Sequence, residues 1–337
     1  MSITVHRRDR HEAAPPSWVR NDRRPSCATI ATATQLPLPT FGRTAQPHGP
    51  RFAHPAEEEF ASLLSWHHVR WVYEPTSFAI DWDEAGAPAS YFRPDFFLPD
   101  ERLYVELTTM RQPLVTQKNR KVRLLRQLYP SVRIKLLYRR DLERLRAAYD
   151  EPAIAPHRSL GEVVFGAAEI EERIRDLSLR IASEWLGLAA AGDPPPVLLA
   201  GHEGALRFAR HIRRELARLG VHAEAGSLRR SRFRFDATAP HLRIARSHPL
   251  DLAGRRVLLL EDAVSTGLSA SATVGWLARQ GAAESRICSL LDRPQARLLD
   301  PPLAWSGFAA PDLPLAGFGM ALHPQFRDLP VIAAVAD

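Results

Sequence analysis

The segment 257–270, VLLLEDAVSTGLSA, constrains the fold of this chain more than any other. Its four leading apolar residues predict a buried β-strand, and the Ser-Thr-Gly-Leu-Ser run predicts the start of a helix. Glu261 and Asp262 follow the apolar residues directly, at the end of a strand, where open α/β sheets bind their ligands. The segment therefore predicts a mostly parallel sheet with a ligand site at this turn.

The residue types of this turn suit a ribose 5-phosphate. A helix N-terminus offers unpaired N–H groups and the positive end of a dipole, and Thr266 and Ser269 add hydroxyl groups that can bind a phosphate monoester. The adjacent carboxylates of Glu261 and Asp262 can hold ribose hydroxyls and Mg²⁺. In the alternative interpretation, the acids only end a strand and the hydroxyl residues only cap a helix.

Alternating helical and strand patterns extend on both sides of this segment and predict two α/β domains. The expected division is a disordered tail at 1–50, a small α/β/α domain at 51–150, a linker at 151–160 and a second α/β domain at 161–337. In the first domain, we expect helices at 54–69, 116–129 and 140–149 and strands at 71–80, 91–99, 103–109 and 132–138. In the second, we expect helices at 170–187, 203–219 and 267–281 and strands at 196–201, 255–262 and 285–292.

Composition excludes several classes of protein. No apolar run is long enough for a membrane span, and the two cysteines are too few for a disulfide framework. We therefore expect a cytoplasmic protein without a membrane contact. The net charge of +7 is weak evidence for nucleic-acid binding, because residues 1–50 hold seven arginines and three acids and so account for +4 of it.

The segment 257–270 resembles the PRPP-binding signature of type I phosphoribosyltransferases, and the chain around it is most similar to the hypoxanthine-guanine branch. The run His202-Glu203-Gly204 follows a predicted strand, where that family has its pyrophosphate loop. The run LLDRP at 290–294 is similar to the family's Leu-Leu-Asp-Lys-Pro, with Arg293 in place of the lysine that contacts the base. The segments 317–319 and 326–330 match the family's closing segment.

The resemblance implies transfer of ribose 5-phosphate from PRPP to a purine base, with Mg²⁺ as cofactor and release of pyrophosphate. It also implies a homo-oligomer, either a dimer or a tetramer. Catalysis would involve Glu261, Asp262 and Ser265, and Arg293 would bind the base. PRPP would be bound by Glu261, Asp262, Ser265, Thr266, Gly267, Leu268 and Ser269, pyrophosphate by His202, Glu203 and Gly204, and Mg²⁺ by Glu261 and Asp262.

Several positions depart from the family pattern. Ser265 stands where an aspartate is proposed to take the proton of the purine N7, and Glu203 stands where a lysine is usual. Leu313 replaces a lysine near the base, and Ala321 replaces an aspartate that helps to hold a second magnesium ion. The alternatives are therefore a PRPP- or nucleotide-binding regulator without catalysis, or a protein that processes nucleic acid through its N-terminal half.

The N-terminal half resembles PD-(D/E)xK nucleases, as in the N-terminal extension found on actinobacterial members of the phosphoribosyltransferase family. Asp95 and Glu106 occupy the positions of its two metal-binding acids, and Glu58 or Glu59 could supply a third. The catalytic lysine position is Thr108, which carries no charge; the alternative source of a cation is Lys118 or Lys121 on the next helix. We therefore expect an inactive nuclease-like domain.

Two further features have no assigned role at this stage. The pair His67-His68 lies beside an apolar helix face and is expected to be surface or core residues. The arginine-rich run at 229–234 either clamps phosphates or forms a solvated hairpin.

Overall fold

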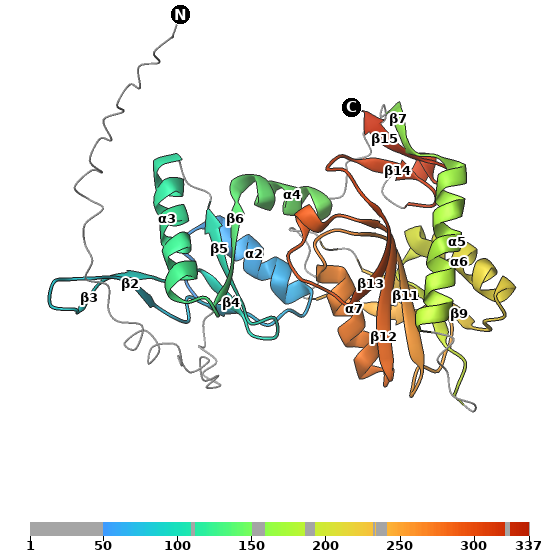
Figure 1. Ribbon diagram of the computed structural model, residues 1–337, viewed down its shortest axis with the longest axis horizontal. Helices are drawn as coiled ribbons and strands as arrows, with labels where there is room; N and C mark the ends of the chain where they lie inside the picture. The colour runs from blue at the N-terminus through green and yellow to red at the C-terminus, as the bar shows by residue number, and fades with distance from the viewer. Residues whose placement is uncertain are drawn as a thin grey trace, which may run out of the picture.

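The computed structural model describes residues 50–108, 112–149, 159–185, 193–231, 233, 241–320 and 324–336. The expected disordered tail falls outside the described residues except for Pro50, and most of the expected linker falls outside them too. Figure 1 shows two bodies, which we call the N-terminal domain (50–149) and the C-terminal domain (159–336).

The N-terminal domain contains one four-stranded sheet, in the order β1-β4-β5-β6, and a separate hairpin of β2 and β3. Only β5 and β6 are parallel within the sheet. The elements are α2 (Pro55–Trp66), β1 (Val72–Tyr73), β2 (Phe78–Trp82), β3 (Pro88–Phe92), β4 (Phe96–Leu98), β5 (Leu103–Thr108), α3 (Gln112–Leu128), β6 (Arg133–Tyr138) and α4 (Arg139–Tyr149).

Alternate residues of this sheet are buried in opposite layers, as the two-residue period of a strand requires. Phe96 and Val105 belong to the apolar cluster that includes residues of α2 and α4. Phe97 and Tyr104 belong to the cluster that includes residues of α3 and of the β2–β3 hairpin. The N-terminal sheet is therefore covered by helices on both faces.

Two of the predicted strands in this domain are each split in the structure. The predicted strand 71–80 is divided between β1 and β2, which belong to different sheets. The predicted strand 91–99 is divided between β3 and β4 in the same way. Glu74 has a positive φ of 44° and precedes Pro75, and Pro94 lies in the second gap, so the backbone cannot continue a ladder through either point.

The C-terminal domain is built on a six-stranded sheet, in the order β10-β9-β8-β11-β12-β13, and a three-stranded sheet, β14-β15-β7. All strands of the large sheet are parallel except β10. Its strands are β8 (Val197–Ala200), β9 (Glu224–Arg230), β10 (Ile244–Arg246), β11 (Arg256–Val264), β12 (Glu284–Asp292) and β13 (Leu303–Ala309). The others are β7 (Ser159–Phe165), β14 (Leu315–Gly317) and β15 (Ile332–Ala336), and the helices are α5 (Ala167–Glu184), η3 (Glu203–Ala205), α6 (Leu206–Arg218), α7 (Leu268–Arg279), η4 (Pro294–Ala296) and η5 (Pro324–Phe326).

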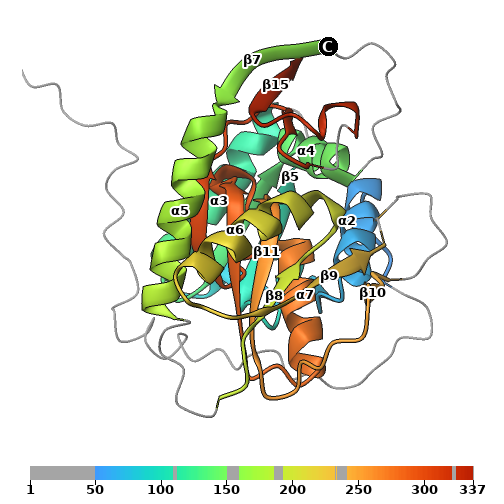
Figure 2. The ribbon, with the colours of Figure 1, turned by 90° about the vertical axis from the view of Figure 1, so that its right-hand side faces the viewer.

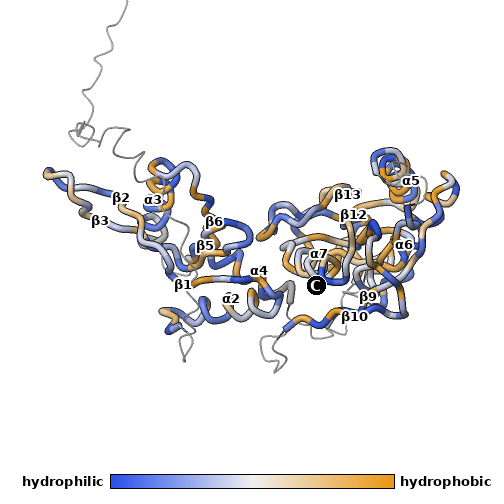
Figure 3. Tube along the Cα trace, turned by 90° about the horizontal axis from the view of Figure 1, so that it is seen from below, coloured by the Kyte–Doolittle hydropathy of each residue, from blue (hydrophilic) through white to orange (hydrophobic). Residues whose placement is uncertain are grey.

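The central strand β11 is buried on both faces. Leu258 and Leu260 pack in the cluster formed with α5 and α6, whereas Val257 and Leu259 pack in the cluster formed with α7. Figure 3 shows both hydrophobic and hydrophilic residues on α5, as expected of an amphipathic helix. The two layers of helices fix the position of β11 and of the turn that follows it.

The two domains share one apolar cluster. It joins residues of α2 and of the N-terminal sheet to Phe233, Leu242, Leu268, Leu298 and Leu299 of the C-terminal domain. Figure 2 shows α2 beside β10 and near α7. Among the described residues, no helix is both long enough and apolar enough to span a membrane.

Candidate functional site

Glu261 and Asp262 lie near the C-terminal end of β11, between the parallel strands β8 and β12. Their exposed fractions are only 2% and 7%. The predicted strand at 255–262 and the predicted helix at 267–281 correspond to β11 and α7. Two carboxylates are therefore held, largely dehydrated, at the edge of the sheet where the sequence predicted a ligand site.

The turn 265–269, which we call the α7 turn, leads from β11 into α7. Gly267 has a φ of 82°, and a β-carbon there would collide with the carbonyl oxygen of Leu299. The backbone N–H groups of Leu298 and Leu299 donate to the carbonyl oxygen of Thr266, at 2.8 and 3.0 Å. The α7 turn is therefore fixed by the segment that packs against it.

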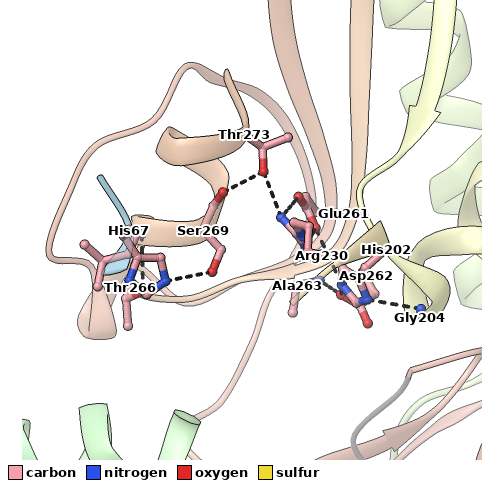
Figure 4. Close-up of polar contacts among 11 residues, drawn as sticks. His67, His202, Gly204, Arg230, Glu261, Asp262, Ala263, Thr266, Ser269 and Thr273 are labelled. Carbon is pink, nitrogen blue, oxygen red and sulfur yellow. Dashed lines mark hydrogen bonds and ion pairs between the residues drawn. The ribbon is translucent and has the colours of Figure 1, made fainter. Parts of the chain in front are cut away.

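Arg230, at the end of β9, forms a bidentate pair with Glu261. Its Nη1 and Nη2 donate to the two carboxylate oxygens at 2.8 and 2.9 Å, and Nη1 also donates to the Thr273 hydroxyl at 3.2 Å. The two side chains are 11% and 3% exposed. Figure 4 shows this contact between β9, β11 and α7.

His202, which follows β8, contacts Asp262. Its Nε2 lies 2.9 Å from Asp262 Oδ1 and 3.6 Å from Glu261 Oε2, and its Nδ1 accepts from the Gly204 N–H at 3.1 Å. Burial acts to lower the pKa of His202, but the charge of Asp262 outweighs it and the pKa is raised. For Asp262 the two effects have the opposite signs: burial acts to raise its pKa, but the neighbouring His202 holds the pKa of Asp262 below its usual value. His202, Glu261 and Asp262 each offer one ligand atom, and these atoms lie within 4.8 Å of one another.

Two further predicted site residues lie at neighbouring strand ends. Glu203 begins η3 and pairs with Arg327 at 2.7 Å. Arg293 follows β12; its Nη2 donates to the Leu313 carbonyl at 3.0 Å, and its buried Nε has no hydrogen-bond partner within the described part of the chain. Burial lowers the pKa of Arg293. Ala321, the other predicted departure, lies outside the described residues.

The N-terminal domain reaches the α7 turn through His67, which has an exposed fraction of 1%. Its Nε2 lies 3.2 Å from Ser269 Oγ, and its Nδ1 lies 2.9 Å from the Leu63 carbonyl oxygen. Burial lowers the pKa of His67 to about 4, and the charge of Arg230 acts in the same direction. No sequence pattern predicts this contact, because it depends on how the two domains dock.

The predicted acids of the N-terminal domain form a second buried cluster. Asp95 and Glu106 are 7% and 2% exposed. Each carboxylate accepts a hydrogen bond from a backbone N–H: the Leu107 N–H donates to Asp95 at 2.6 Å, and the Asp95 N–H donates to Glu106 at 3.2 Å. Lys118 lies 2.5 Å from Glu106 and also donates to the Leu107 carbonyl at 2.7 Å. Thr108 is buried beside them, and its hydroxyl has no partner among the described residues.

The third buried acid of this domain is Glu57, and neither Glu58 nor Glu59 is buried. Glu57 forms a capping box with His54 at the start of α2, and it accepts from the Tyr73 hydroxyl at 2.7 Å. Burial raises the pKa of Asp95 to about 7, and the charges of Glu106 and Glu57 add to that rise. Because this capping box begins with a histidine, the usual Ser/Thr-x-x-Glu pattern would not have identified Glu57 from the sequence.

Comparison with known proteins bears on the C-terminal domain. Residues 166–325 match the family model of the phosphoribosyl transferase domain. Over these residues the C-terminal domain is similar to phosphoribosyl transferase domains. Two curated relatives are the hypoxanthine-guanine-xanthine phosphoribosyltransferase of Tritrichomonas foetus, 25% identical over 53% of this chain and 93% of that protein, and the hypoxanthine-guanine phosphoribosyltransferase of Mycobacterium tuberculosis, 27% identical over 51% of this chain and 85% of that protein.

Solved structures of similar proteins include a hypoxanthine-guanine phosphoribosyltransferase from Bacillus anthracis. It is 21% identical to this chain, with a TM-score of 0.47, and the match covers 54% of this chain and all of that one. The matches to the phosphoribosyl transferase domain thus concern about half of the chain.

Proposed function

We propose that the phosphoribosyl transferase domain transfers ribose 5-phosphate from PRPP to a purine base of the hypoxanthine-guanine type, giving a nucleoside 5′-monophosphate and pyrophosphate. The observation that carries this proposal is the buried Glu261–Asp262 pair near the C-terminal end of β11, separated by two residues from the α7 turn. The homologous phosphoribosyltransferases support it. A homo-oligomer and a cytoplasmic location stay predictions.

In this proposal the two halves of the site hold the two ends of the ribose. The N–H groups at the start of α7 and the hydroxyls of Thr266 and Ser269 bind the 5-phosphate. Glu261 and Asp262 accept hydrogen bonds from the ribose hydroxyls, and charge-assisted bonds of this kind are about twice as strong as neutral ones. The Arg230–Glu261 pair must open for this, because Arg230 covers both oxygens of Glu261.

In the reaction, the bond between C1 of the ribose and the pyrophosphate oxygen breaks, and its electron pair leaves with pyrophosphate. A ring nitrogen of the base donates the electron pair of the new bond to C1, and the base loses one proton. The carboxylates of Glu261 and Asp262 stabilise the positive charge that develops on the ribose ring. Arg293 donates to the exocyclic oxygen of the base, and Ser265 lies on the side of the base from which the proton is lost. The 202–204 loop faces pyrophosphate.

The donor set at this site suits Mg²⁺, which prefers carboxylate oxygens and retains several water molecules. Glu261 and Asp262 would hold the ion, directly or through water, and His202 lies within reach of both. When bound, Mg²⁺ would offset the negative charge of the pyrophosphate group.

The test is incubation of the full chain with PRPP, Mg²⁺ and each of hypoxanthine, guanine, xanthine and adenine, with the monophosphate measured by chromatography. We expect product with at least one 6-oxopurine and none in the Glu261→Gln/Asp262→Asn double variant. Asp251→Asn, on the exposed loop before β11, is the matched control and should retain activity. PRPP binding without product would favour the alternative of a PRPP-binding regulator. If PRPP does not bind and no product forms, the proposal is refuted.

Lys118 favours a second candidate function in the N-terminal domain, namely metal-dependent cleavage of nucleic acid. Thr108 lacks the charge that such chemistry needs, but Lys118 reaches Glu106 from α3 and brings a cation to the Asp95–Glu106 cluster. Asp95 and Glu106 would then hold the metal ion and Lys118 would offset charge near the attacked phosphodiester.

This candidate is tested with plasmid DNA and single-stranded RNA in Mg²⁺ or Mn²⁺. Cleavage by the full chain should be lost in Asp95→Asn and in Lys118→Ala, and Lys121→Ala on the same helix is the matched control. If all substrates stay intact, the domain is inactive, as Thr108 alone suggests.

A further inference from the structure

The C-terminal end of α2 lies on the α7 turn. Besides the His67–Ser269 contact, the Leu242 N–H donates to the Trp66 carbonyl at 2.7 Å, and His68 Nε2 lies 3.1 Å from the Leu242 carbonyl oxygen. The segment before β10 and the α7 turn are therefore both tied to the same helix end. These contacts join residues of two domains that are about 170–200 positions apart in sequence.

The direction of the His67–Ser269 hydrogen bond follows from the other ring nitrogen. The Leu63 carbonyl can only accept, so His67 Nδ1 carries the hydrogen. Burial keeps the ring neutral near pH 7, so Nε2 has a lone pair and no hydrogen. The Ser269 hydroxyl must therefore donate to His67, and it has no second hydrogen to offer to a phosphate oxygen.

Apolar side chains also pack the end of α2 against the C-terminal domain. The Trp66 and Phe233 rings lie edge to face, with centroids 5.4 Å apart, and Leu268 of the α7 turn is fully buried in the cluster shared by the domains. A lone pair and apolar side chains are a poor environment for a phosphate dianion, because they supply no donor and exclude water. The helix end and a bound 5-phosphate therefore compete for Ser269.

We propose that His67 belongs to the phosphoribosyl site as a residue that sets its affinity: it holds the Ser269 hydroxyl in the closed protein, and PRPP must displace the end of α2 to bind. This inference rests on the proposed function. The proposed role of the N-terminal domain is to control access to the α7 turn by docking and undocking of α2. This role requires no catalysis by the N-terminal domain. The apparent affinity for PRPP is reduced by the fraction of molecules in which the helix end is docked.

The test is calorimetric titration of the full chain with PRPP and Mg²⁺, comparing the wild type with His67→Ala, Ser269→Ala and the double variant. Removing one neutral hydrogen bond changes an equilibrium by about two- to tenfold. We expect His67→Ala to bind PRPP about two- to tenfold more tightly, and we expect no such gain in the Ser269→Ala background, because the two residues act as a pair. If His67→Ala folds poorly, His67→Leu removes the acceptor and keeps the site apolar.

A second measurement separates this role from a purely structural one. Hydrogen exchange at the Leu242 amide reports on its bond to Trp66, so saturating PRPP should accelerate exchange there in the wild type. Unchanged or weaker PRPP binding in the His67 variants, or unchanged exchange at Leu242, would overturn the proposal while leaving the proposed function intact. Failure of PRPP to bind any variant would reject both.

Discussion

Arg230 and Glu261 form a bidentate ion pair across the neighbouring strand β8. Gly201, directly after β8, makes the contact possible, because a β-carbon at this position would fall within 3 Å of the Glu261 carboxylate. The pair is almost fully removed from water. A guanidinium therefore neutralises a carboxylate that, in the proposed reaction, binds the ribose and Mg²⁺, and opening of the site requires that this charge be compensated by another partner.

The first prediction concerns Arg230→Met. Removal of one partner of a buried ion pair typically destabilises a protein by about 3–5 kcal/mol, because the other charge stays buried without compensation. We expect a lower midpoint of thermal unfolding, and we expect Mg²⁺ to raise that midpoint more in Arg230→Met than in the wild type. Arg229→Met, at the exposed neighbouring position, is the control. Equal Mg²⁺ effects in both variants would contradict the view that Arg230 covers the metal-binding carboxylate.

The second prediction concerns Lys118, which pairs with the buried Glu106. Burial raises the pKa of Glu106, and Lys118 opposes that rise. Lys118→Met should therefore raise the pKa of Glu106 further and lower the free energy of unfolding at pH 7, by about 3 kcal/mol if the carboxylate stays ionised. Denaturant titration measures the effect, with Lys121→Met as control. A loss no larger than that of Lys121→Met would show that Lys118 is not needed to compensate Glu106.

The third prediction follows from the lowered pKa of His67. The pKa is about 4 in the folded chain against 6.5 for the free side chain, and its causes are burial and the neighbouring charges of Arg230 and His68. As the pH falls below 6.5, the unfolded chain binds a proton that the folded chain does not, so stability decreases until about pH 4. This difference amounts to about 3 kcal/mol over the whole interval.

The measurement compares the wild type with His67→Leu at pH 7 and at pH 5. The loss of stability between the two pH values should be smaller in His67→Leu, while His222→Leu, at an exposed position of the C-terminal domain, should behave like the wild type. Identical pH dependence in the wild type and His67→Leu would show that the buried ring is not the group responsible.

Local patterns were sufficient for the parts of the site that one segment contains. The apolar run before Glu261 predicts β11, and the hydroxyl-rich run predicts the start of α7, because strand burial and helix capping depend on neighbouring residues. Arg230 was recognised only as one member of an arginine-rich run, since its partner lies on a strand two places away in the sheet. Sequence spacing gives no information on such a contact.

In the N-terminal domain, too, the sequence predicts some of the clustered residues but not all of them. Asp95 directly precedes β4 and Glu106 lies on β5. The two acids lie close together because β4 and β5 pair and are joined by a short connection. The choice between Lys118 and Lys121 depended on the rotation of α3, and the choice of Glu57 over its neighbours depended on the capping of α2. Docking of His67 on Ser269 depends on the packing of whole domains, which no local pattern encodes.

The last prediction concerns Ser265, which lies on the partly exposed α7 turn, three residues after Asp262. In the proposed reaction the base loses a proton, and a serine hydroxyl accepts it far less readily than a carboxylate does. Positioned general acid–base catalysis is typically worth about 10²–10⁴-fold, so Ser265→Asp should raise the turnover of hypoxanthine or guanine. An opposing effect is the repulsion between a new anion and the 5-phosphate, which is worth about 1 kcal/mol or more at a few ångströms in a partly buried site. We expect the gain in proton transfer to exceed this loss, because a carboxylate at 265 can point toward the base while the N–H groups of α7 retain the phosphate.

Steady-state kinetics of Ser265→Asp should then show a higher kcat with a nearly unchanged KM for PRPP. Ser265→Asn, which has a similar shape but cannot take a proton, should show no gain. Equal rates for Ser265→Asp and Ser265→Asn would mean that the proton of the base leaves by another route.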